Sequence, residues 1–286
     1  MLQEIRGLGF EYAELSHGIR MGFLPGILEA VTAGEIKISS LHNFCPLPMG
    51  VNQAAPNLYQ FSADRDRERE LAERYTIKTL EFGERVGAPV VVLHSGSIDM
   101  KNYTDKLLDL VDRGQKETPQ YQKLSADAAR KCEARKEAFF ERTKEMLKKI
   151  APEAEKRGIK LGIENRQALE ELPLDSDFPF LFKELDNPAF VYWHDTGHAQ
   201  IKENLGFINH LLHLESLRDR LAGFHIHDVQ FAGKDHCPPG TGKVNFAALA
   251  PLIKPDHLKV FEFSPALTVN EVQTGVAHVR HLWGTP

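Results

Sequence analysis

Seven short apolar runs recur along the chain, and each ends in a histidine, an aspartate or a glutamate. They occupy residues 12–17, 38–42, 90–94, 161–164, 191–195, 224–225 and 260–262. Short runs rich in valine, leucine, isoleucine and aromatic residues are typical of buried strands. The pattern therefore predicts strands at residues 12–17 and near 36–43, 90–95, 159–165, 189–195, 222–228 and 258–263.

Charged segments with helical periodicity separate several of these strands. Residues 64–86 carry a strongly charged face and apolar positions for packing, and Gly87 then gives a helix-ending signal. Residues 135–157 predict a second long helix that ends at Gly158. Residues 2–8 predict a short helix before the first strand. Strands and helices that alternate in this way favour a parallel sheet.

The length of 286 residues suits one α/β barrel. We predict the α/β class: a TIM-type (β/α) barrel of parallel strands that forms a single domain over residues 1–286. An eight-stranded barrel normally opens with a strand, whereas this chain opens with a helix and shows seven strand patterns. We therefore expect the barrel to lack its first strand, either because it is incomplete or because its start lies upstream of Met1.

A polar and charged segment, residues 99–133, lies outside the regular alternation of strands and helices. It contains no strand pattern and continues into the helix predicted from residue 135. We expect a helical insertion that partly covers the face on which the strands end.

Composition narrows the class of protein without identifying it. The net charge is −5 at pH 7, so no global basic excess attracts nucleic acid or an anionic membrane. The chain has no apolar run of about eighteen residues and no secretory pattern at its start. Its three cysteines are widely spaced and form no CxxC pair, which favours a reducing cytoplasm.

Parallel barrel strands deliver their C-terminal residues to one face, where barrel enzymes build their active sites. Here those ends carry carboxylates and imidazoles, which suit a divalent metal such as Zn, Mn or Fe. Glu164 needs a partner after its apolar strand, since an unpaired buried carboxylate is costly. A metal or an arginine would supply it, and pairing with Arg166 is the structural alternative. Asp195 and His198 are spaced so that a turn can bring both side chains to one point.

Further strand ends carry side chains of the same kind. His225 and His227 share one strand face, which fits either a site or core packing with a structural hydrogen bond. Glu262 lies between two phenylalanines and points away from them, into the barrel mouth if they pack against helices. His42 and His94 end two earlier strands and are either ligands or hydrogen-bonding neighbours of ligands.

The segment from Lys234 to Lys243 is rich in glycine and proline and contains His236. Its backbone N–H groups and the Lys243 ammonium group are suited to hold a phosphate or a sugar hydroxyl. A surface loop shaped by its prolines is the alternative.

The ordered set of these motifs resembles the xylose isomerase-like TIM barrel superfamily. The motifs are Glu164, Asp195 with His198, His225 with Asp228, the loop from His236 to Gly242, and Glu262. The resemblance extends from about residue 7 to residue 280. The superfamily contains sugar and sugar-phosphate isomerases and epimerases, inosose dehydratases and type-IV apurinic endonucleases, so the set indicates the superfamily more closely than the reaction.

The ketose 3-epimerase branch implies one Mn-type ion held by Glu, Asp, His and Glu. The matching positions here are Glu164, Asp195, His225 and Glu262. A substrate-contacting histidine of that branch matches His198, and its second glutamate loosely matches Glu170. Its substrate-binding arginine has no counterpart, because Phe231 stands near that position.

The endonuclease branch binds three zinc ions through nine ligands. Counterparts of eight are present, namely His42, His94, Glu164, Asp195, His198, His225, His236 and Glu262. The ninth, an aspartate two residues before the loop histidine, is Lys234 here. Because an ammonium group repels a metal cation, the sequence favours one metal over a cluster of three.

These features predict a divalent-metal-dependent isomerase or epimerase that acts on a sugar, a sugar phosphate or a related polyol. We expect one Mn, Zn, Co, Fe or Mg ion as cofactor, acting as a Lewis acid. One of Glu164 and Glu262 would remove the proton next to the substrate carbonyl, and the other would return one through an enediolate. Substrate contacts are expected from His198, His236, His94, His42, Glu170 and Lys243.

Three alternatives stay open. A metal-dependent lyase or dehydratase acting on keto-sugars or inososes begins with the same deprotonation. An AP-endonuclease-type phosphodiesterase and a non-catalytic barrel subunit are the other two. We expect a cytoplasmic protein with a small carbohydrate substrate and with neither a membrane nor a nucleic acid as partner. Whether it forms a homo-oligomer is left open.

Overall fold

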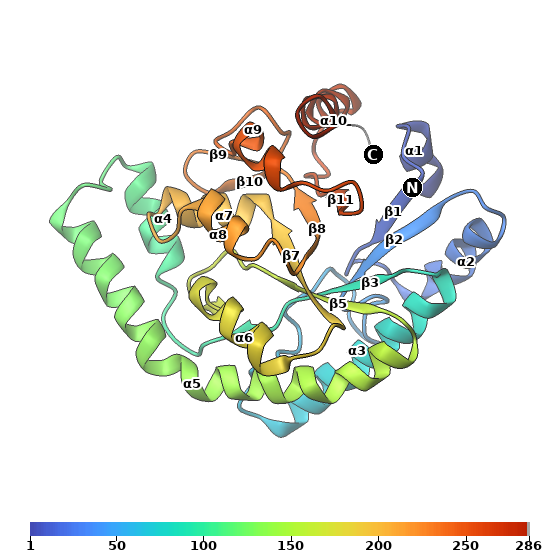
Figure 1. Ribbon diagram of the computed structural model, residues 1–286, viewed down its shortest axis with the longest axis horizontal. Coiled ribbons are helices and arrows are strands. Elements are labelled where there is room, and N and C mark those ends of the chain that lie inside the picture. Colours follow the sequence, from blue (N-terminus) through green and yellow to red (C-terminus); the bar gives the residue numbers. More distant parts are fainter. Residues whose placement is uncertain (285–286) are drawn as a thin grey trace. The chain divides into compact units, whose positions relative to one another are not determined.

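The computed structural model describes residues 1–284 (Figure 1). The chain divides into two compact units, and each contains parallel strands with helices around them. The first unit consists of Met1–Gly96, Phe139–Glu164 and Phe182–Val191. The second consists of Ser97–Ala138, Asn165–Leu181 and the described residues from Tyr192 onward.

Four parallel strands form the centre of the first unit. In spatial order they are β1 (Tyr12–Leu15), β2 (Lys37–His42), β3 (Val90–Leu93) and β5 (Lys160–Glu164). Val91 pairs with Leu161 across β3 and β5, and every residue of β3 is buried. A strand buried on both faces needs no polar alternation, which explains its unbroken run of valine and leucine.

The helices of the first unit end where the sequence carries stop signals. Helix α3 (Asp66–Val86) is followed by Gly87 with a φ of 71°, a left-handed conformation that glycine adopts without strain. Thr76, Leu80 and Gly83 lie on its buried face. The other helical elements of this unit are α1 (Leu2–Gly7), η1 (Met21–Phe23) and α2 (Leu24–Thr32).

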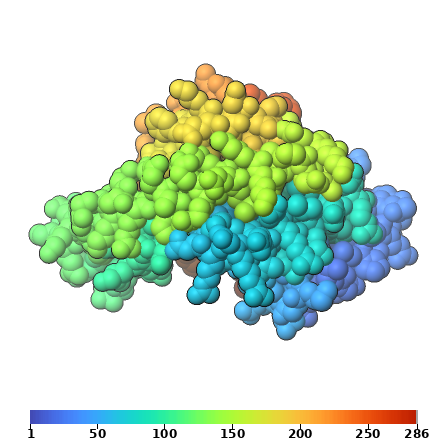
Figure 2. Space-filling model, turned by 90° about the horizontal axis from the view of Figure 1, so that it is seen from below, coloured from blue at the N-terminus to red at the C-terminus, as the bar shows by residue number. Residues whose placement is uncertain are grey.

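The C-terminal part of the long helix α5 (Pro119–Lys156) lies beside α3 in the first unit. Ion pairs join Lys149 to Glu73 at 2.6 Å, and Arg157, just past the helix end, to Glu84 at 3.4 Å. Both helices reach the surface seen in Figure 2, where α5 is green and α3 is light blue.

Three parallel strands form the centre of the second unit. They are β7 (Phe190–Asp195), whose first two residues belong to the first unit, β8 (Leu221–Ile226) and β11 (Leu258–Phe261). Trp193 on β7 lies opposite Gly223 on β8. A Cβ atom on Gly223 would lie 2.4 Å from the indole ring, so glycine makes room for the buried tryptophan.

Short helices and a hairpin complete the second unit. Helix α10 begins at a capping box in which Thr268 and Glu271 bond each other's backbone N–H groups. The helical elements after β7 are α7 (Thr196–Asn204), α8 (His210–Ser216), α9 (Phe246–Leu249), η3 (Ala250–Leu252) and α10 (Val269–Trp283). The hairpin consists of β9 (Asp228–Gln230) and β10 (Lys234–Cys237). Smaller elements are β4 (Gly96–Ser97), β6 (Glu171–Leu172), η2 (Asp175–Asp177) and α6 (Phe178–Leu185).

The segment 99–133 is largely helical, as predicted, but the predicted helix start at residue 135 is wrong. Helix α4 (Thr104–Asp112) is followed by α5, which runs without interruption from Pro119. No glycine occurs between Gly114 and Gly158, so no glycine signal separates residues 119–134 from the helix predicted to start at residue 135. In the second unit this helical segment shares an apolar core with the β9–β10 hairpin through Val229 and Ala232.

The seven strands predicted from the sequence correspond to the seven parallel strands of residues 1–284, with ends that differ by a few residues. The main difference is at 222–228, because β8 ends at Ile226 and Asp228 begins the hairpin. A missing first strand and a single domain over the whole chain stay predictions. No helix within residues 1–284 is long and apolar enough to cross a membrane.

Candidate functional site

The first unit brings three of the predicted residues together at the ends of its strands. His42 and Glu164 are the last residues of β2 and β5, and His94 follows β3 directly. Nε2 of His94 lies 2.8 Å from Oε2 of Glu164, and Nε2 of His42 lies 3.6 Å from the same oxygen. Glu164 is buried, and within this unit two imidazoles face its carboxylate.

The hydrogen bonds around His42 show what this cluster could hold. Nδ1 of His42 lies 2.9 Å from the carbonyl oxygen of Asn43, so this nitrogen carries the proton and donates it. In the neutral ring, Nε2 then presents a lone pair toward the carboxylate of Glu164. A proton or a cation between the two would relieve this repulsion. His42, His94 and Glu164 each offer one atom within 4.8 Å of the others, which suits a metal ion.

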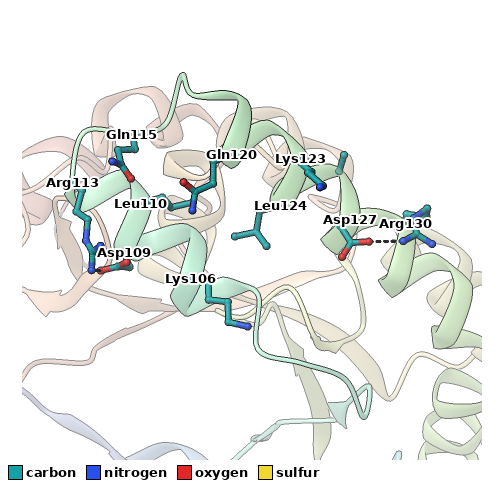
Figure 3. A pocket seen from close by; sticks show the side chains of 11 residues that line it. Lys106, Asp109, Leu110, Arg113, Gln115, Gln120, Lys123, Leu124, Asp127 and Arg130 are labelled. Carbon is teal, nitrogen blue, oxygen red and sulfur yellow. Dashed lines mark hydrogen bonds and ion pairs between the residues drawn. The ribbon is translucent and has the colours of Figure 1, made fainter.

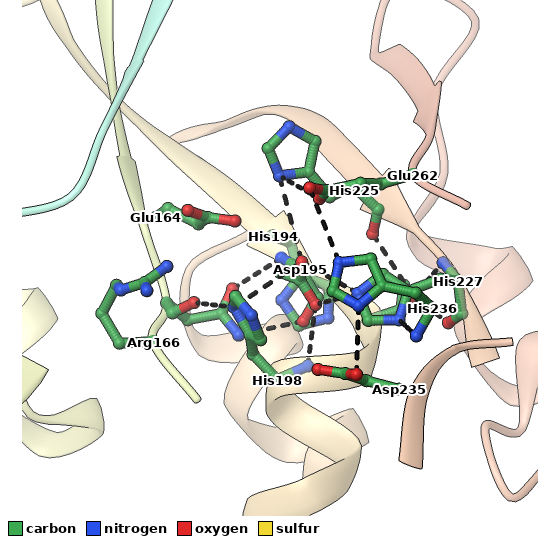
Figure 4. A network of polar contacts seen from close by, with 12 residues as sticks. Glu164, Arg166, His194, Asp195, His198, His225, His227, Asp235, His236 and Glu262 are labelled. Atoms are coloured by element: carbon green, nitrogen blue, oxygen red, sulfur yellow. Dashed lines mark hydrogen bonds and ion pairs between the residues drawn. The ribbon is translucent and has the colours of Figure 1, made fainter. Parts of the chain in front are cut away.

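The second unit brings together Asp195, His225 and Glu262 (Figure 4). Nδ1 of His225 lies 3.3 Å from Oε2 of Glu262 and 3.9 Å from Oδ2 of Asp195. Asp195 and His225 are fully buried, whereas the Glu262 side chain is 33% exposed. An imidazole nitrogen that approaches two carboxylates offers the kind of donors that a divalent metal such as Mn or Zn takes.

Two neighbours hold Asp195 in place at the end of β7. Asn165 accepts a hydrogen bond from the Asp195 backbone N–H at 2.7 Å and donates one to its carbonyl at 3.0 Å. The Asp195 carboxylate caps α7 by accepting from the His198 backbone N–H at 2.7 Å. The His198 ring then lies with Nδ1 3.6 Å from Oδ2 of Asp195, so the turn does bring the two side chains to one point.

The glycine-rich loop folds around the carboxylate of Asp228. That carboxylate accepts hydrogen bonds at 2.8–3.0 Å from the backbone N–H groups of Val229, Gly240, Gly242 and Val244. A Cβ atom on Gly242 would lie 2.4 Å from an oxygen of Asp228, so only glycine permits this approach. Among the N–H groups predicted to hold a phosphate or a sugar hydroxyl, those of Gly240 and Gly242 are thus used by the chain itself, and binding of a substrate group by this loop stays a prediction. Sequence reasoning assigned Asp228 to the superfamily motif but missed this role.

His236 belongs to the same group of polar side chains, and its ring carries a positive charge. Its Nε2 lies 3.6 Å from Oε1 of Glu262, and its Nδ1 lies 3.1 Å from Oδ1 of Asp235. Burial favours the neutral ring, but the two carboxylates outweigh burial and raise the pKa of His236 to about 10. Its positive charge can therefore neutralise Glu262 or face a substrate oxygen.

Glu170 and Lys243 have other surroundings in the structure. Oε1 of Glu170 accepts from the backbone N–H groups of Tyr103 and Thr104, and Oε2 accepts from the Thr104 hydroxyl at 2.7 Å. Glu170 therefore caps the start of α4. Lys243 is exposed, and its backbone N–H donates to Val229. Their predicted contacts with substrate stay predictions.

A separate groove of about 920 Å³ lies between α4 and the beginning of α5 (Figure 3). Its charged residues include two internal ion pairs, Arg113 with Asp109 and Arg130 with Asp127. All of its lining residues fall between Lys106 and Arg130, so none of the predicted site residues lines it.

The parallel strands carry carboxylates and imidazoles near their carboxyl ends. The protein is therefore of the (β/α) class and has a candidate metal centre. The chain belongs to the xylose isomerase-like TIM barrel family, whose family model matches residues 2–257. The predicted fold class and superfamily are therefore confirmed.

Solved structures of sugar epimerases share this fold. A D-tagatose 3-epimerase-like protein is 16% identical, covers 98% of this chain and 91% of its own, and gives a TM-score of 0.69. An E. coli 3-keto-D-glucoside 4-epimerase is 14% identical, with coverages of 98% and 92% and a TM-score of 0.68. A D-psicose 3-epimerase from Clostridium cellulolyticum H10, solved with D-tagatose, is 14% identical, with coverages of 99% and 93% and a TM-score of 0.68. No curated protein matches the chain.

Proposed function

We propose that the protein is a cytoplasmic enzyme, a sugar isomerase or epimerase that works with one divalent metal ion. The approach of the His225 ring to the carboxylates of both Asp195 and Glu262, near the ends of three adjacent strands, carries this proposal. The substrate class is supported by the family and by the sugar epimerases that share the fold. The names of these neighbours mention D-tagatose, a 3-keto-D-glucoside and D-psicose, so a keto-sugar is the first substrate to test.

The donor set of the second unit would hold the metal through Asp195, His225 and Glu262. Glu164 as the fourth ligand stays the prediction that the resemblance makes. A bound divalent ion supplies Lewis-acid polarisation of a carbonyl and lowers the cost of removing the neighbouring proton. Asp195 and His225 are too buried to meet a substrate directly, so holding the ion is the role that their surroundings support.

Glu262 is suited to move a proton, because a third of its side chain is accessible while one oxygen faces His225. In an epimerase, Glu262 and Glu164 would act on opposite faces of the same carbon, and each transfer contributes about 10²–10⁴-fold. His198 donates from Nδ1 to the carbonyl oxygen of Asn165 at 3.0 Å. This leaves Nε2 of the ring as the nitrogen available to contact a substrate hydroxyl.

Metal content and a substrate screen test the proposal together. We expect about one Mn, Zn, Fe or Co ion per chain in the wild type and less than half of that in Glu262→Gln. Exposed Glu215→Gln, a charge-matched control on α8, should keep the wild-type content. The loaded wild type is then screened with ketoses, inososes and 3-keto glycosides. Wild-type protein that binds no divalent ion under any loading condition would overturn the proposal. Elimination products in place of epimers would identify a lyase or dehydratase.

One observation favours a second candidate, a phosphodiesterase with several metals. His42, His94 and Glu164 form a metal-type group of their own in the first unit. Near three zinc ions per chain, with cleavage of DNA that contains abasic sites, would support this candidate over the sugar enzyme. Lys234 stands against it, because its exposed ammonium group replaces an expected ligand and bonds Gln230 at 3.2 Å.

A further inference from the structure

His227 connects two parts of the candidate site that are distant in sequence. Its Nε2 lies 3.0 Å from Oδ1 and 3.1 Å from Oδ2 of Asp195 (Figure 4). On its other side, its ring is stacked on His236 with centroids 4.4 Å apart and planes 4° from parallel. His227 and Asp195 are both fully buried, so neither reaches solvent for an alternative partner.

The protonation pattern of His227 follows from its backbone contact. The N–H of His236 donates to Nδ1 of His227 at 2.9 Å, so Nδ1 accepts and carries no proton. The proton of the neutral ring is therefore on Nε2, which faces Asp195. His227 thus donates from Nε2 to the Asp195 carboxylate, and a backbone bond from the glycine-rich loop keeps Nδ1 as the acceptor.

The packing around the ring admits this arrangement only because residue 197 is glycine. A Cβ atom on Gly197 would lie 1.9 Å from Cε1 and 2.4 Å from Nδ1 of His227. Thr196 fixes the backbone next to it, donating from its hydroxyl to the His227 carbonyl at 2.7 Å and accepting from the His227 N–H at 3.1 Å. The start of α7 is therefore shaped to receive this imidazole.

We propose that His227 is a positioning residue that orients the Asp195 carboxylate toward the metal. Because His227 also accepts the hydrogen bond from the His236 N–H, it couples this orientation to the loop of His236. The proposal rests on the proposed function in one respect, that Asp195 is a metal ligand. A carboxylate ligand needs an outer hydrogen-bond donor to hold its orientation, and loss of such a partner commonly weakens metal binding about 10–100-fold. Because His227 contacts both oxygens of Asp195, it can set that orientation.

Binding of Mn²⁺ to EDTA-treated full-length protein, measured by calorimetry, tests the proposal. We expect His227→Leu to weaken the dissociation constant about 10–100-fold. His227→Gln keeps an N–H donor near the same position and should stay within a few-fold of the wild type. His257→Leu removes another buried imidazole of the second unit, outside the Asp195 network, and serves as the matched control. Gly197→Ala keeps the imidazole but displaces it, and should weaken binding in the same way if His227→Leu fails to fold.

A double-mutant cycle with Asp195→Asn tests whether His227 affects metal binding through Asp195. If His227 acts through Asp195, adding His227→Leu to Asp195→Asn should cause little further loss. Fully additive losses, unchanged binding in His227→Leu and Gly197→Ala, or an equal loss in His257→Leu would each overturn the positioning role while leaving the proposed function intact. Wild-type protein that binds no Mn²⁺, Zn²⁺ or Co²⁺ would overturn both.

Discussion

At the scale of single residues, the candidate site depends on a few buried polar groups that have complete sets of partners. Asp228 is the clearest case, because its carboxylate accepts four backbone hydrogen bonds, two of them from glycines of the loop that contains His236. A buried carboxylate would be costly alone, and these four donors stabilise it while they fix the loop of His236. The loop is therefore shaped by an internal anion rather than by a bound one.

Replacing Asp228 should unfold this loop and destabilise the protein. We expect Asp228→Ala to lower the free energy of unfolding by on the order of 3 kcal/mol, because it leaves several partly buried N–H groups without an acceptor. Asp228→Asn keeps one acceptor oxygen and should cost less. Urea denaturation followed by circular dichroism measures both, with exposed Asp219→Ala as control. A loss below about 1 kcal/mol in Asp228→Ala would show that the loop holds its shape by other means.

At the scale of elements, a network of buried imidazoles joins β7 to α8. The Tyr192 hydroxyl lies 2.8 Å from Nδ1 of His194 and 3.0 Å from Nε2 of His213. Nε2 of His194 lies 2.9 Å from Nε2 of His210. Burial lowers the pKa of His210 to about 3 and that of His213 to about 4, so both rings are neutral in the folded protein at neutral pH.

This network predicts a loss of stability in mild acid. The unfolded chain takes up protons on these histidines below about pH 6.5, whereas the folded protein does not until about pH 4, so stability falls as pH falls through this window. Each ring contributes a slope of up to about 1.4 kcal/mol per pH unit. His210→Gln should flatten the dependence of urea stability on pH between 6.5 and 4.5, and exposed His281→Gln should change it less. Equal slopes in wild type and His210→Gln would contradict this account.

Local pattern allowed the strands and their chemistry to be predicted, because each apolar run and its terminal His, Asp or Glu are adjacent in sequence. The start of α5 was misplaced because residues 119–134 are mostly polar and charged, and their buried positions, such as Tyr121 and Ala128, are few. The contact of His227 with Asp195 could not be predicted, since it joins residues 32 positions apart. The same holds for Glu170, whose partner helix begins 66 residues earlier. The sequence therefore predicts which segments are helices and strands, but not the hydrogen bonds between residues that are distant along the chain.

At the scale of the whole molecule, chain length, net charge and strand-end chemistry agree with one class of activity. Seven parallel strands within residues 1–284 carry carboxylates or imidazoles at or near their C-terminal ends, and the family is that of xylose isomerase-like TIM barrels. The net charge of −5 gives no broad attraction for a polyanion such as DNA. A small neutral keto-sugar, deprotonated next to its carbonyl, is the substrate class that this combination favours.

Proton exchange with solvent tests that claim most directly. Metal-loaded protein is incubated in D₂O with a panel of ketohexoses, ketopentoses, inososes and 3-keto glycosides, and the recovered sugars are examined by mass spectrometry and NMR. The account predicts deuterium at a carbon next to the carbonyl of at least one sugar, lost after EDTA treatment and in Glu262→Gln. Metal-loaded wild-type protein that introduces no deuterium into any sugar of the panel would contradict it.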